Sequence, residues 1–266
     1  MTTATTPEAT SPVRRERDER GVLRLTLARP QSFNALSTGM LTALQRELDA
    51  AAVDDTVRVV VIAAEGKAFS AGHDLKEMRA EPSQAYYEAL FAQCAQTMLT
   101  IQRLPVPVIA RVQGIATAAG CQLVAACDLA VAASTARFAV SGVNLGLFCS
   151  SPSVALSRNL QRKAAFEMLV TGDFISAEEA KARGLVNRVA APEALDAEVE
   201  MLVAAIVAKP RVAIAMGKQL FYRQLEVGVE AAYHDAGRTM ACNMMDEAAL
   251  EGVQAFIDKR KPAWAG

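Results

Sequence analysis

Two hydrophobic periods alternate along the first half of this chain, and they predict strands that alternate with helices. Alternating or continuously apolar, β-branched runs are typical of strands, whereas apolar residues three or four apart are typical of one helix face. The predicted strands are 23–27, 57–62, 106–112 and 129–132. The predicted helices run from the N-cap Ser37 to about Ala52, somewhere within 83–103, and near 121–126. Because the middle strands are apolar throughout, we expect an α/β core whose sheet is covered on both faces.

Beyond residue 151 the pattern becomes mainly helical. Helical periods occupy 151–158, 162–171, 176–183 and 192–208, with a short strand expected at 185–189. Ser176 and Glu179 have the spacing of a capping box, and Gly184 is placed to end that helix. From Pro210 onward the sequence is predicted to be helical, with too few apolar residues for a core of its own. This region is therefore expected to pack on the main domain or on another subunit.

The first twenty residues are rich in Thr, Ala, Pro and charge and contain almost no apolar side chains. Such a segment cannot offset its ordering entropy by burial, which predicts a mobile tail. A transit peptide is the alternative, but its acidic residues, Glu8, Glu16, Asp18 and Glu19, disfavour it. The expected organisation is a flexible tail at 1–20, an α/β core at 21–205 and a helical C-terminal region at 206–266.

Composition narrows the class of protein. The chain has 266 residues and 52% hydrophobic content, enough for a substantial core. Its formal net charge of −1 provides no bulk field for nucleic acid or anionic lipid, and apolar runs of transmembrane length are absent from the sequence. The five cysteines are widely spaced, without metal-ligand spacing, which favours reduced thiols, no metal and a cytoplasmic location. They are Cys94, Cys121, Cys127, Cys149 and Cys242.

Two short motifs carry the chemistry. F-S-A-G-H-D-L at Phe69–Leu75 and T-A-A-G-C-Q-L at Thr117–Leu123 each follow a predicted strand with small residues and a glycine. A backbone N–H in such a turn can be left to meet a ligand oxygen. Two converging donors of this kind would form an oxyanion hole, which stabilises the negative charge that develops on a carbonyl oxygen during a reaction.

At these motifs the chain resembles the enoyl-CoA hydratase/isomerase superfamily, the crotonase fold, over nearly all of its length after the tail. The resemblance extends to R-P-Q-S-F-N-A-L at Arg29–Leu36, G-K-A-F-S-A-G-H-D-L-K-E-M at Gly66–Met78, the segment 114–128, and A-F-I-D-K-R-K-P-A-W at Ala255–Trp264. Within the superfamily it looks most like the enoyl-CoA hydratase domain-containing protein 3 group. The implied fold is a crotonase-like (ClpP/crotonase) spiral of repeated ββα units with a C-terminal helical region that builds homotrimers or hexamers.

The resemblance also implies a ligand, an acyl-CoA thioester, with coenzyme A as part of the substrate and no separate cofactor. The backbone N–H groups of His73 and Ala119 match the two donors that bind the thioester oxygen, and Gln122 matches a position lining the acyl group. Ala119 stands where the family usually has glycine. Further matching substrate positions are Arg29, Ala71, Asp74, Leu75, Lys76, Gly142, Asn144, Phe256 and Lys259, with Lys261 as an additional cation.

Two positions depart from the family pattern. Where hydratases of the family carry glutamates, this chain has Gln122 and Gly142. Adding water across a double bond needs one group to deprotonate the water and another to deliver a proton, and neither an amide nor a glycine does this readily. Standard two-glutamate hydration is therefore not expected. A hydratase-like or isomerase-like reaction, a catalytically silent acyl-CoA-binding regulator of lipid metabolism, and an acyl-CoA thioesterase or decarboxylase remain open.

Several of these side chains also have a purely structural interpretation. Gln122 is either a satisfied polar residue at a helix start or a ligand contact, and the His73 imidazole is expected at the CoA entrance or in solvent rather than in catalysis. Cys149, Ser150 and Ser151 are expected to form a helix start with a serine N-cap, the alternative being a nucleophilic Cys149. Asp74 and Asp128 are expected to brace their loops, and His234 to be structural.

Overall fold

The computed structural model describes residues 11–80 and 82–265 of the chain. Its strands are β1 (Val13–Arg17), β2 (Val22–Leu27), β3 (Val59–Ala64), β4 (Ala68–Ser70), β5 (Val108–Val112), β6 (Ile115–Thr117), β7 (Leu129–Ala133), β8 (Arg137–Ala139), β9 (Ile175–Ser176) and β10 (Arg188–Ala190). Its α-helices are α1 (Thr38–Ala52), α2 (Leu75–Ala80), α3 (Gln84–Arg103), α4 (Ala119–Ala126), α5 (Ser150–Asn159), α6 (Arg162–Thr171), α7 (Ala177–Ala182), α8 (Leu195–Val207), α9 (Arg211–Gln224), α10 (Val229–Met244) and α11 (Glu247–Ile257). Short 3-10 turns are η1 (Pro30–Ser32), η2 (Ser141–Leu145), η3 (Pro192–Ala194) and η4 (Ala263–Ala265).

The strands form two sheets, and successive pairs of strands along the chain add one strand to each sheet. One sheet has the order β1-β2-β3-β5-β7-β10, parallel except for β1, and the other has the order β4-β6-β8-β9, parallel except for β9. The successive pairs β3 with β4, β5 with β6 and β7 with β8 each place one strand in each sheet, and helices follow each pair. The predicted spiral of repeated ββα units is confirmed.

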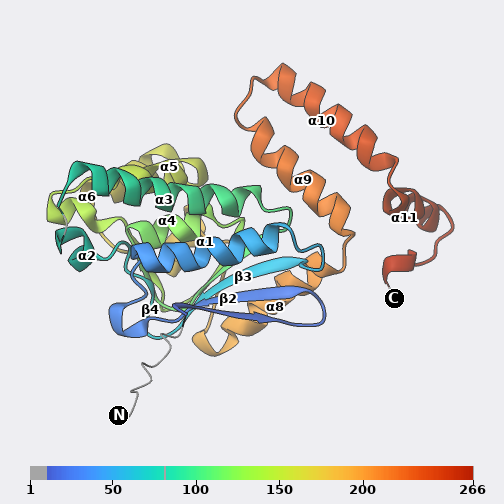
Figure 1. Ribbon diagram of the computed structural model, residues 1–266. Helices are drawn as coiled ribbons and strands as arrows, with labels where there is room; N and C mark the ends of the chain where they lie inside the picture. The colour runs from blue at the N-terminus through green and yellow to red at the C-terminus, as the bar shows by residue number, and fades with distance from the viewer. Residues whose placement is uncertain (1–10, 81, 266) are drawn as a thin grey trace, which may run out of the picture.

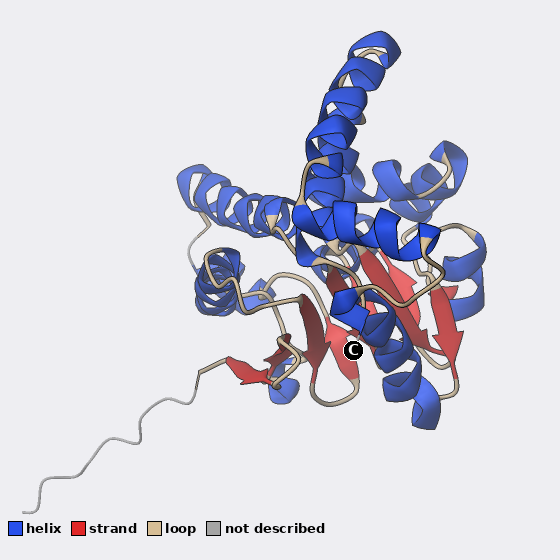
Figure 2. Ribbon diagram, turned by 90° about the vertical axis from the view of Figure 1, so that its right-hand side faces the viewer, coloured by secondary structure: helices blue, strands red, loops and turns tan. Residues whose placement is uncertain are grey.

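The larger sheet is buried on both faces, as its apolar strands predict. Side chains alternate across β3, so Val60 and Ile62 belong to the main core cluster, which also includes residues of α1, α3 and α4. Val59 and Val61 face the other way, toward a second cluster that contains residues of α8. Figures 1 and 2 show the helices on both sides of the strands. Burying Leu195, Val199 and Val203 of α8 contributes about 1.5–3 kcal/mol for each side chain.

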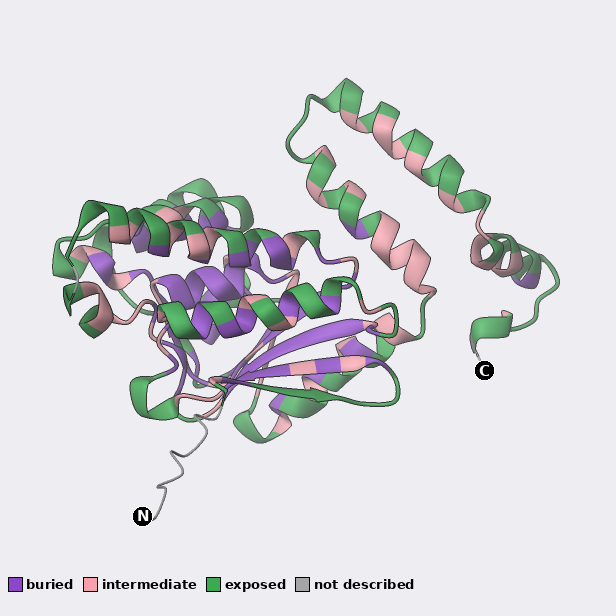
Figure 3. Ribbon diagram, in the orientation of Figure 1, coloured by how far each residue is buried: buried purple, intermediate pink, exposed green. Residues whose placement is uncertain are grey.

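The C-terminal helices α9, α10 and α11 form an arm that leads away from the core (Figure 1). Figure 3 shows the arm almost entirely as exposed or half-buried surface, in contrast to the buried strands of the core. Large apolar side chains of the arm are exposed, among them Phe221 at 56%, Met240 at 71% and Phe256 at 85%. Lys218 is the residue of α9 that is buried. Within the described residues, none of the helices is both long enough and apolar enough to span a bilayer.

The structure corrects the prediction of a mobile tail as far as residue 20. Val13–Arg17 form β1, which pairs antiparallel with β2 and brings Val13 opposite Leu27. Val13 is buried, whereas the four residues after it are exposed, so β1 is an edge strand with charged residues on most of its surface. Residues 1–10 lie outside the described residues.

Other predicted boundaries shift for local reasons. The strand expected from residue 106 begins at Val108, because Pro107 has no N–H to donate and its carbonyl accepts from Val60 instead. The strand expected at 185–189 begins at Arg188, because the N–H groups of Leu185 and Val186 both reach back to the carbonyl of Ala180. Gly184 ends α7 with a φ of 91°, as predicted.

Candidate active site

The first motif loop is held by the segment that precedes α1. Gly72, with a φ of 86°, presents its carbonyl to the N–H of Leu36 at 2.7 Å, and the N–H of Ala71 donates to the carbonyl of Phe33 at 3.0 Å. Buried Asn34 organises this segment, since its amide nitrogen donates to the carbonyl groups of Glu65 (2.8 Å) and Ala68 (2.9 Å). The loop after β4 is therefore fixed on a hydrogen-bonded support.

The second motif loop leads into α4 through a strained residue. Ala118 has φ 50° and ψ −123°, a conformation that L side chains rarely adopt. Its N–H donates to the carbonyl of Ala139 at 3.0 Å, and its own carbonyl accepts from the N–H of Gln122 at 3.1 Å. Such a conformation costs on the order of 1–3 kcal/mol and persists only where surrounding contacts hold it. Ala118 is the neighbour of the predicted donor Ala119 and is not itself among the predicted site residues.

The two loops meet at Gly72. A Cβ atom added there would lie 2.9 Å from Cβ of Ala118 and 3.1 Å from the backbone nitrogen of Ala119, so a side chain at this position would collide with the second loop. Gly120 is equally close to the first motif, because its added Cβ would lie 2.2 Å from the carbonyl oxygen of Ser70. Among the residues that the structure describes, neither the N–H of His73 nor that of Ala119 has a hydrogen-bond acceptor. The N–H groups of His73 and Ala119, which have no acceptor among the described residues, therefore lie next to the close contact between Gly72 and Ala118.

The His73 ring is half-buried against the protein, which argues against the solvent position, one of the two that were expected for it. Its Nδ1 is 3.1 Å from the carbonyl oxygen of Leu36, and the ring lies against Phe91 with centroids 5.4 Å apart. Burial lowers the pKa of the imidazole, outweighing the hydrogen bond to Leu36. The neutral ring therefore buttresses the loop that carries the His73 N–H.

Gln122 lies on α4, one turn after Ala119. Its side chain is 4% exposed, and its Oε1 atom is buried without a hydrogen-bond partner within the described part of the chain. An unpaired buried acceptor is costly, and native proteins rarely retain one without a role for it. Of the two interpretations of Gln122, the structure disfavours the satisfied polar residue.

Gly142, in η2, has no room for a side chain. A Cβ atom there would lie 2.5 Å from the carbonyl oxygen of Leu147 and 2.8 Å from Sγ of Cys149. The backbone of Gly142 lies close enough to the Cys149 sulfur to lower the pKa of the thiol. The space into which a longer residue at this position would point is therefore already occupied by the chain itself.

The segment after η2 begins a helix, but not with a serine cap. Cys149 is the N-cap of α5, and Ser150 is its first helical residue, which corrects the expected Ser150 or Ser151 cap. Burial raises the pKa of the Cys149 thiol, so the thiol form prevails at neutral pH and a nucleophilic role is not favoured. Asn144 turns toward the end of α6, where its Nδ2 lies 3.4 Å from the carbonyl oxygen of Gly172.

The expected ligand-binding residues separate into two groups. Near the loops, Asp74 caps α2 by accepting from the N–H of Lys76 (2.9 Å) and of Glu77 (3.2 Å), as predicted, and the side chains of Leu75 and Lys76 are exposed. Arg29 begins the supporting segment, where its N–H donates to Oδ1 of Asn34. Phe256 instead lies in α11, and Lys259 and Lys261 follow this helix, which Figure 1 shows at the opposite end of the molecule from α2. One chain does not bring them to the loops.

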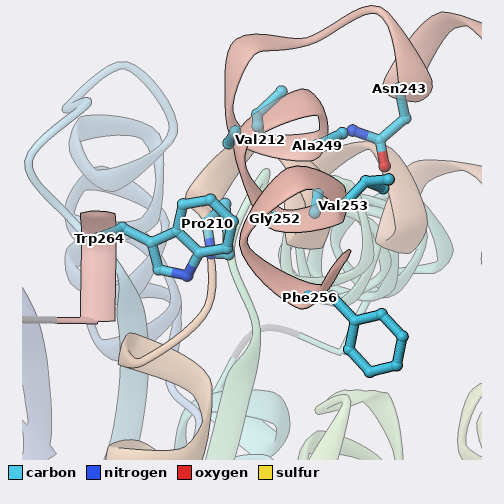
Figure 4. Close-up of a pocket in the computed structure, with 10 residues that line it drawn as sticks. Pro210, Val212, Asn243, Ala249, Gly252, Val253, Phe256 and Trp264 are labelled. Carbon is cyan, nitrogen blue, oxygen red and sulfur yellow. The ribbon is translucent and has the colours of Figure 1, made fainter. Parts of the chain in front are cut away.

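A separate hollow of about 360 Å³ lies in the arm and not at the motif loops (Figure 4). Its lining is almost wholly apolar and comes from Pro210, Val212, Ala213, Asn243, Ala248, Ala249, Gly252, Val253, Phe256 and Trp264. Trp264 packs over Gly252, where an added Cβ would lie 2.6 Å from the indole ring.

Asp128 has two partners that were not predicted from the sequence. Asp128 accepts from the N–H of Val108, which agrees with its expected bracing role, but it also binds Lys218 and Tyr222 of α9. The one signal in the sequence is a lysine and a tyrosine spaced by four residues on a predicted helix, which puts both on one face.

Comparison with known proteins identifies relatives over nearly the whole chain. A family model described as enoyl-CoA hydratase/isomerase matches residues 17–266. A Mycobacterium smegmatis structure described as an enoyl-CoA hydratase is 69% identical, covers 96% of this chain and 99% of its own, and superposes with a TM-score of 0.95. The human enoyl-CoA hydratase domain-containing protein 3 structure is 43% identical, covers 95% and 100%, and has a TM-score of 0.92.

A Xenopus laevis protein named enoyl-CoA hydratase domain-containing protein 3, mitochondrial, is 47% identical over 92% of this chain and 84% of its own length. The resemblance to this group is confirmed. The expected cytoplasmic location is contradicted, because this relative and its rat, mouse and human counterparts are named as mitochondrial proteins. Free cysteines, of which Cys242 is exposed and the other four are buried, suit either compartment, so cysteine usage was too weak an indicator of location.

Proposed function

The chain belongs to the enoyl-CoA hydratase/isomerase family, and from that premise we propose that it binds an acyl-CoA thioester between the N–H groups of His73 and Ala119. The observation that carries the proposal is the pair of donors that have no acceptor among the described residues and lie beside the contact of Gly72 with Ala118. Fixed donors in a site that excludes water stabilise the negative charge of an enolate oxygen by several kcal/mol. Coenzyme A enters as part of the substrate, with no separate cofactor.

Gln122 lines the acyl group in this proposal. Its unpaired Oε1 is an acceptor for a bound water molecule or for a donor on the ligand. An amide orients water without taking its proton, so the reaction is hydratase-like or isomerase-like with a proton donor other than a glutamate pair. The oxyanion site also suits thioester hydrolysis or decarboxylation, which share the same charged oxygen.

The second candidate function is acyl-CoA binding without turnover, in a regulator of lipid metabolism. The closed environment of Gly142 favours it, because the chain itself fills the space that a second acid would need. In either case, the arm is the proposed oligomerisation region of a homotrimer or hexamer. Its exposed apolar side chains, such as Met240 and Phe256, support that proposal.

Calorimetry and product analysis with crotonyl-CoA and longer enoyl-CoA thioesters test these functions. Saturable binding with a hydrated or isomerised product supports the enzyme, and binding without any product at high protein concentration supports the silent binder. Free coenzyme A or carbon dioxide in the mass spectrum identifies the thioesterase or decarboxylase. Absence of binding to every thioester would refute the proposal as a whole.

A further inference from the structure

Ala118 is a strained residue held on both sides. Its positive φ of 50° is natural for glycine and unfavourable for alanine. The hydrogen bonds of its N–H to Ala139 and of its carbonyl to Gln122 fix the peptide groups on either side. The methyl group therefore projects in a direction that the backbone does not allow to vary.

That direction leads to the other motif loop. The position of a Cβ on Gly72 would be only 2.9 Å from Cβ of Ala118, so the real methyl group lies directly against the backbone of Gly72. Each partner in this contact immediately precedes one of the two unused N–H donors, His73 and Ala119. A shift of either loop across this contact would change the separation of the donors.

We propose that the Ala118 methyl group is a spacer that sets the distance between the His73 and Ala119 N–H groups. Ala118 is thus a positioning residue, and the inference rests on the proposed function because the spacing matters only if both donors bind one oxygen. The benefit of preorganised donors depends on their being in place before the charge develops. A glycine at 118 would relieve the strain but leave the loops free to approach or separate.

The test compares two ligands that differ at the carbonyl alone: butyryl-CoA, a thioester, and S-butyl-CoA, its thioether analogue. The dissociation constant of the thioether divided by that of the thioester reports the contribution of the two donors. In Ala118→Gly we expect this ratio to fall about tenfold, while the melting temperature stays equal to or above that of the wild type, because the strain is removed. If the methyl group were purely structural, Ala118→Gly would lower the melting temperature and leave the ratio unchanged.

Ala125→Gly is the matched control, because it removes a buried methyl group from α4, the helix that Ala118 precedes, at a position away from Gly72. It should lower the melting temperature and leave the ligand ratio unchanged. A wild-type ratio near one would refute the shared oxygen site, and the spacer with it. A normal wild-type ratio that persists in Ala118→Gly, an equal loss in both variants, or a less stable Ala118→Gly would refute the spacer alone.

Discussion

Nζ of Lys218 lies 2.6 Å from Oδ2 of Asp128, joining the arm to the core across 90 residues of sequence. The other two ammonium protons donate to the carbonyl groups of Ile101 (2.8 Å) and Val106 (2.9 Å), while Oδ1 of Asp128 accepts from the Tyr222 hydroxyl (2.8 Å). Burial lowers the pKa of Lys218 and raises that of Asp128, because both charges lose hydration, and their contact opposes these shifts. The hydrogen bonds of Lys218 and Asp128 inside the protein compensate for the hydration that the two charges lose on burial.

Lys218→Met should therefore be strongly destabilising. The variant leaves the Asp128 carboxylate buried without its cation, which typically costs about 3–5 kcal/mol. Urea denaturation measures the change in the free energy of unfolding. Arg223 lies in the same helix as Lys218, and Arg223→Ala is the control, because it breaks an exposed ion pair with Asp235 of α10 and should cost less than about 1 kcal/mol. Equal losses in the two variants would contradict the special role of the buried pair.

Acid should release the end of the chain from α11. Arg260 and the N–H of Ala263 both bind the Glu251 carboxylate and lower its pKa from 4.5 to about 2. A lowered pKa means that this attachment is complete above pH 4.5 and is lost as the pH falls toward 2. Trp264, the single tryptophan of the sequence, lies on Gly252 beside it, so its fluorescence should shift to the red over this range.

Glu251→Gln should show the red-shifted emission already at pH 7, with the helical circular dichroism unchanged. Glu247→Gln changes an exposed carboxylate of the same helix and should behave as the wild type. A blue emission maximum that is retained in Glu251→Gln would show that Trp264 is held without the carboxylate.

His73 should make the fold less stable below neutral pH. Its folded-state pKa is lower than the ordinary 6.5, so below that pH the unfolded chain takes up a proton before the folded chain does. The free energy of unfolding should therefore decline as the pH drops below about 6.5. His73→Phe keeps a ring beside Phe91 and should flatten the decline, whereas replacing exposed His234 by alanine should not. Parallel pH profiles for all three proteins would refute this assignment.

Gln122→Met should separate stability from ligand binding. The change replaces an unpaired buried amide oxygen with an apolar group of similar length, so stability should hold or rise by up to about 1–2 kcal/mol. Affinity for acyl-CoA or turnover should fall. Gln45→Met is the control: Oε1 of Gln45 is also unpaired within the described residues, but its Nε2 donates to Asp49 and Thr100, so losing these bonds should reduce stability and spare the ligand. A Gln122→Met protein with full ligand affinity would remove Gln122 from the site.

Restoring an acid at position 142 should fail. Gly142→Glu would drive Cβ to within 2.5 Å of the Leu147 carbonyl, and overpacking of this kind costs about 1–3 kcal/mol or more. Gln122→Glu preserves the side-chain length and should fold normally. Thermal unfolding of both variants tests this, and a Gly142→Glu protein as stable as the wild type would show that the turn is free to move.

Local signals allowed much of the fold to be predicted. The helix expected from Ser37 is α1, with the Ser37 hydroxyl accepting from the N–H of Met40 at 3.1 Å, and the helix expected at 162–171 has those bounds. The Ser176–Glu179 capping box forms as expected. Each of these features depends on residues within one or two turns of each other, where spacing alone specifies the contact.

The predictions that failed depend on partners far away in sequence. The charged segment 13–17 has no apolar face that would identify a strand, and it becomes one because β2 offers an unpaired edge. Likewise, nothing near Lys218 identifies Asp128, and the strain at Ala118 depends on Gly72 and Ala139. The motifs locate the candidate site, but the short distances between its two loops depend on how the folded loops pack against each other.

The long separation between Asp128 and Lys218 also constrains the order in which the protein is made. A ribosome that has synthesised the chain through β10 has supplied every described strand of both sheets, yet the aspartate at the start of β7 still lacks its cation. A nascent or truncated chain that stops before residue 218 must keep that carboxylate hydrated or protonated. Completion of the core during synthesis therefore waits for α9.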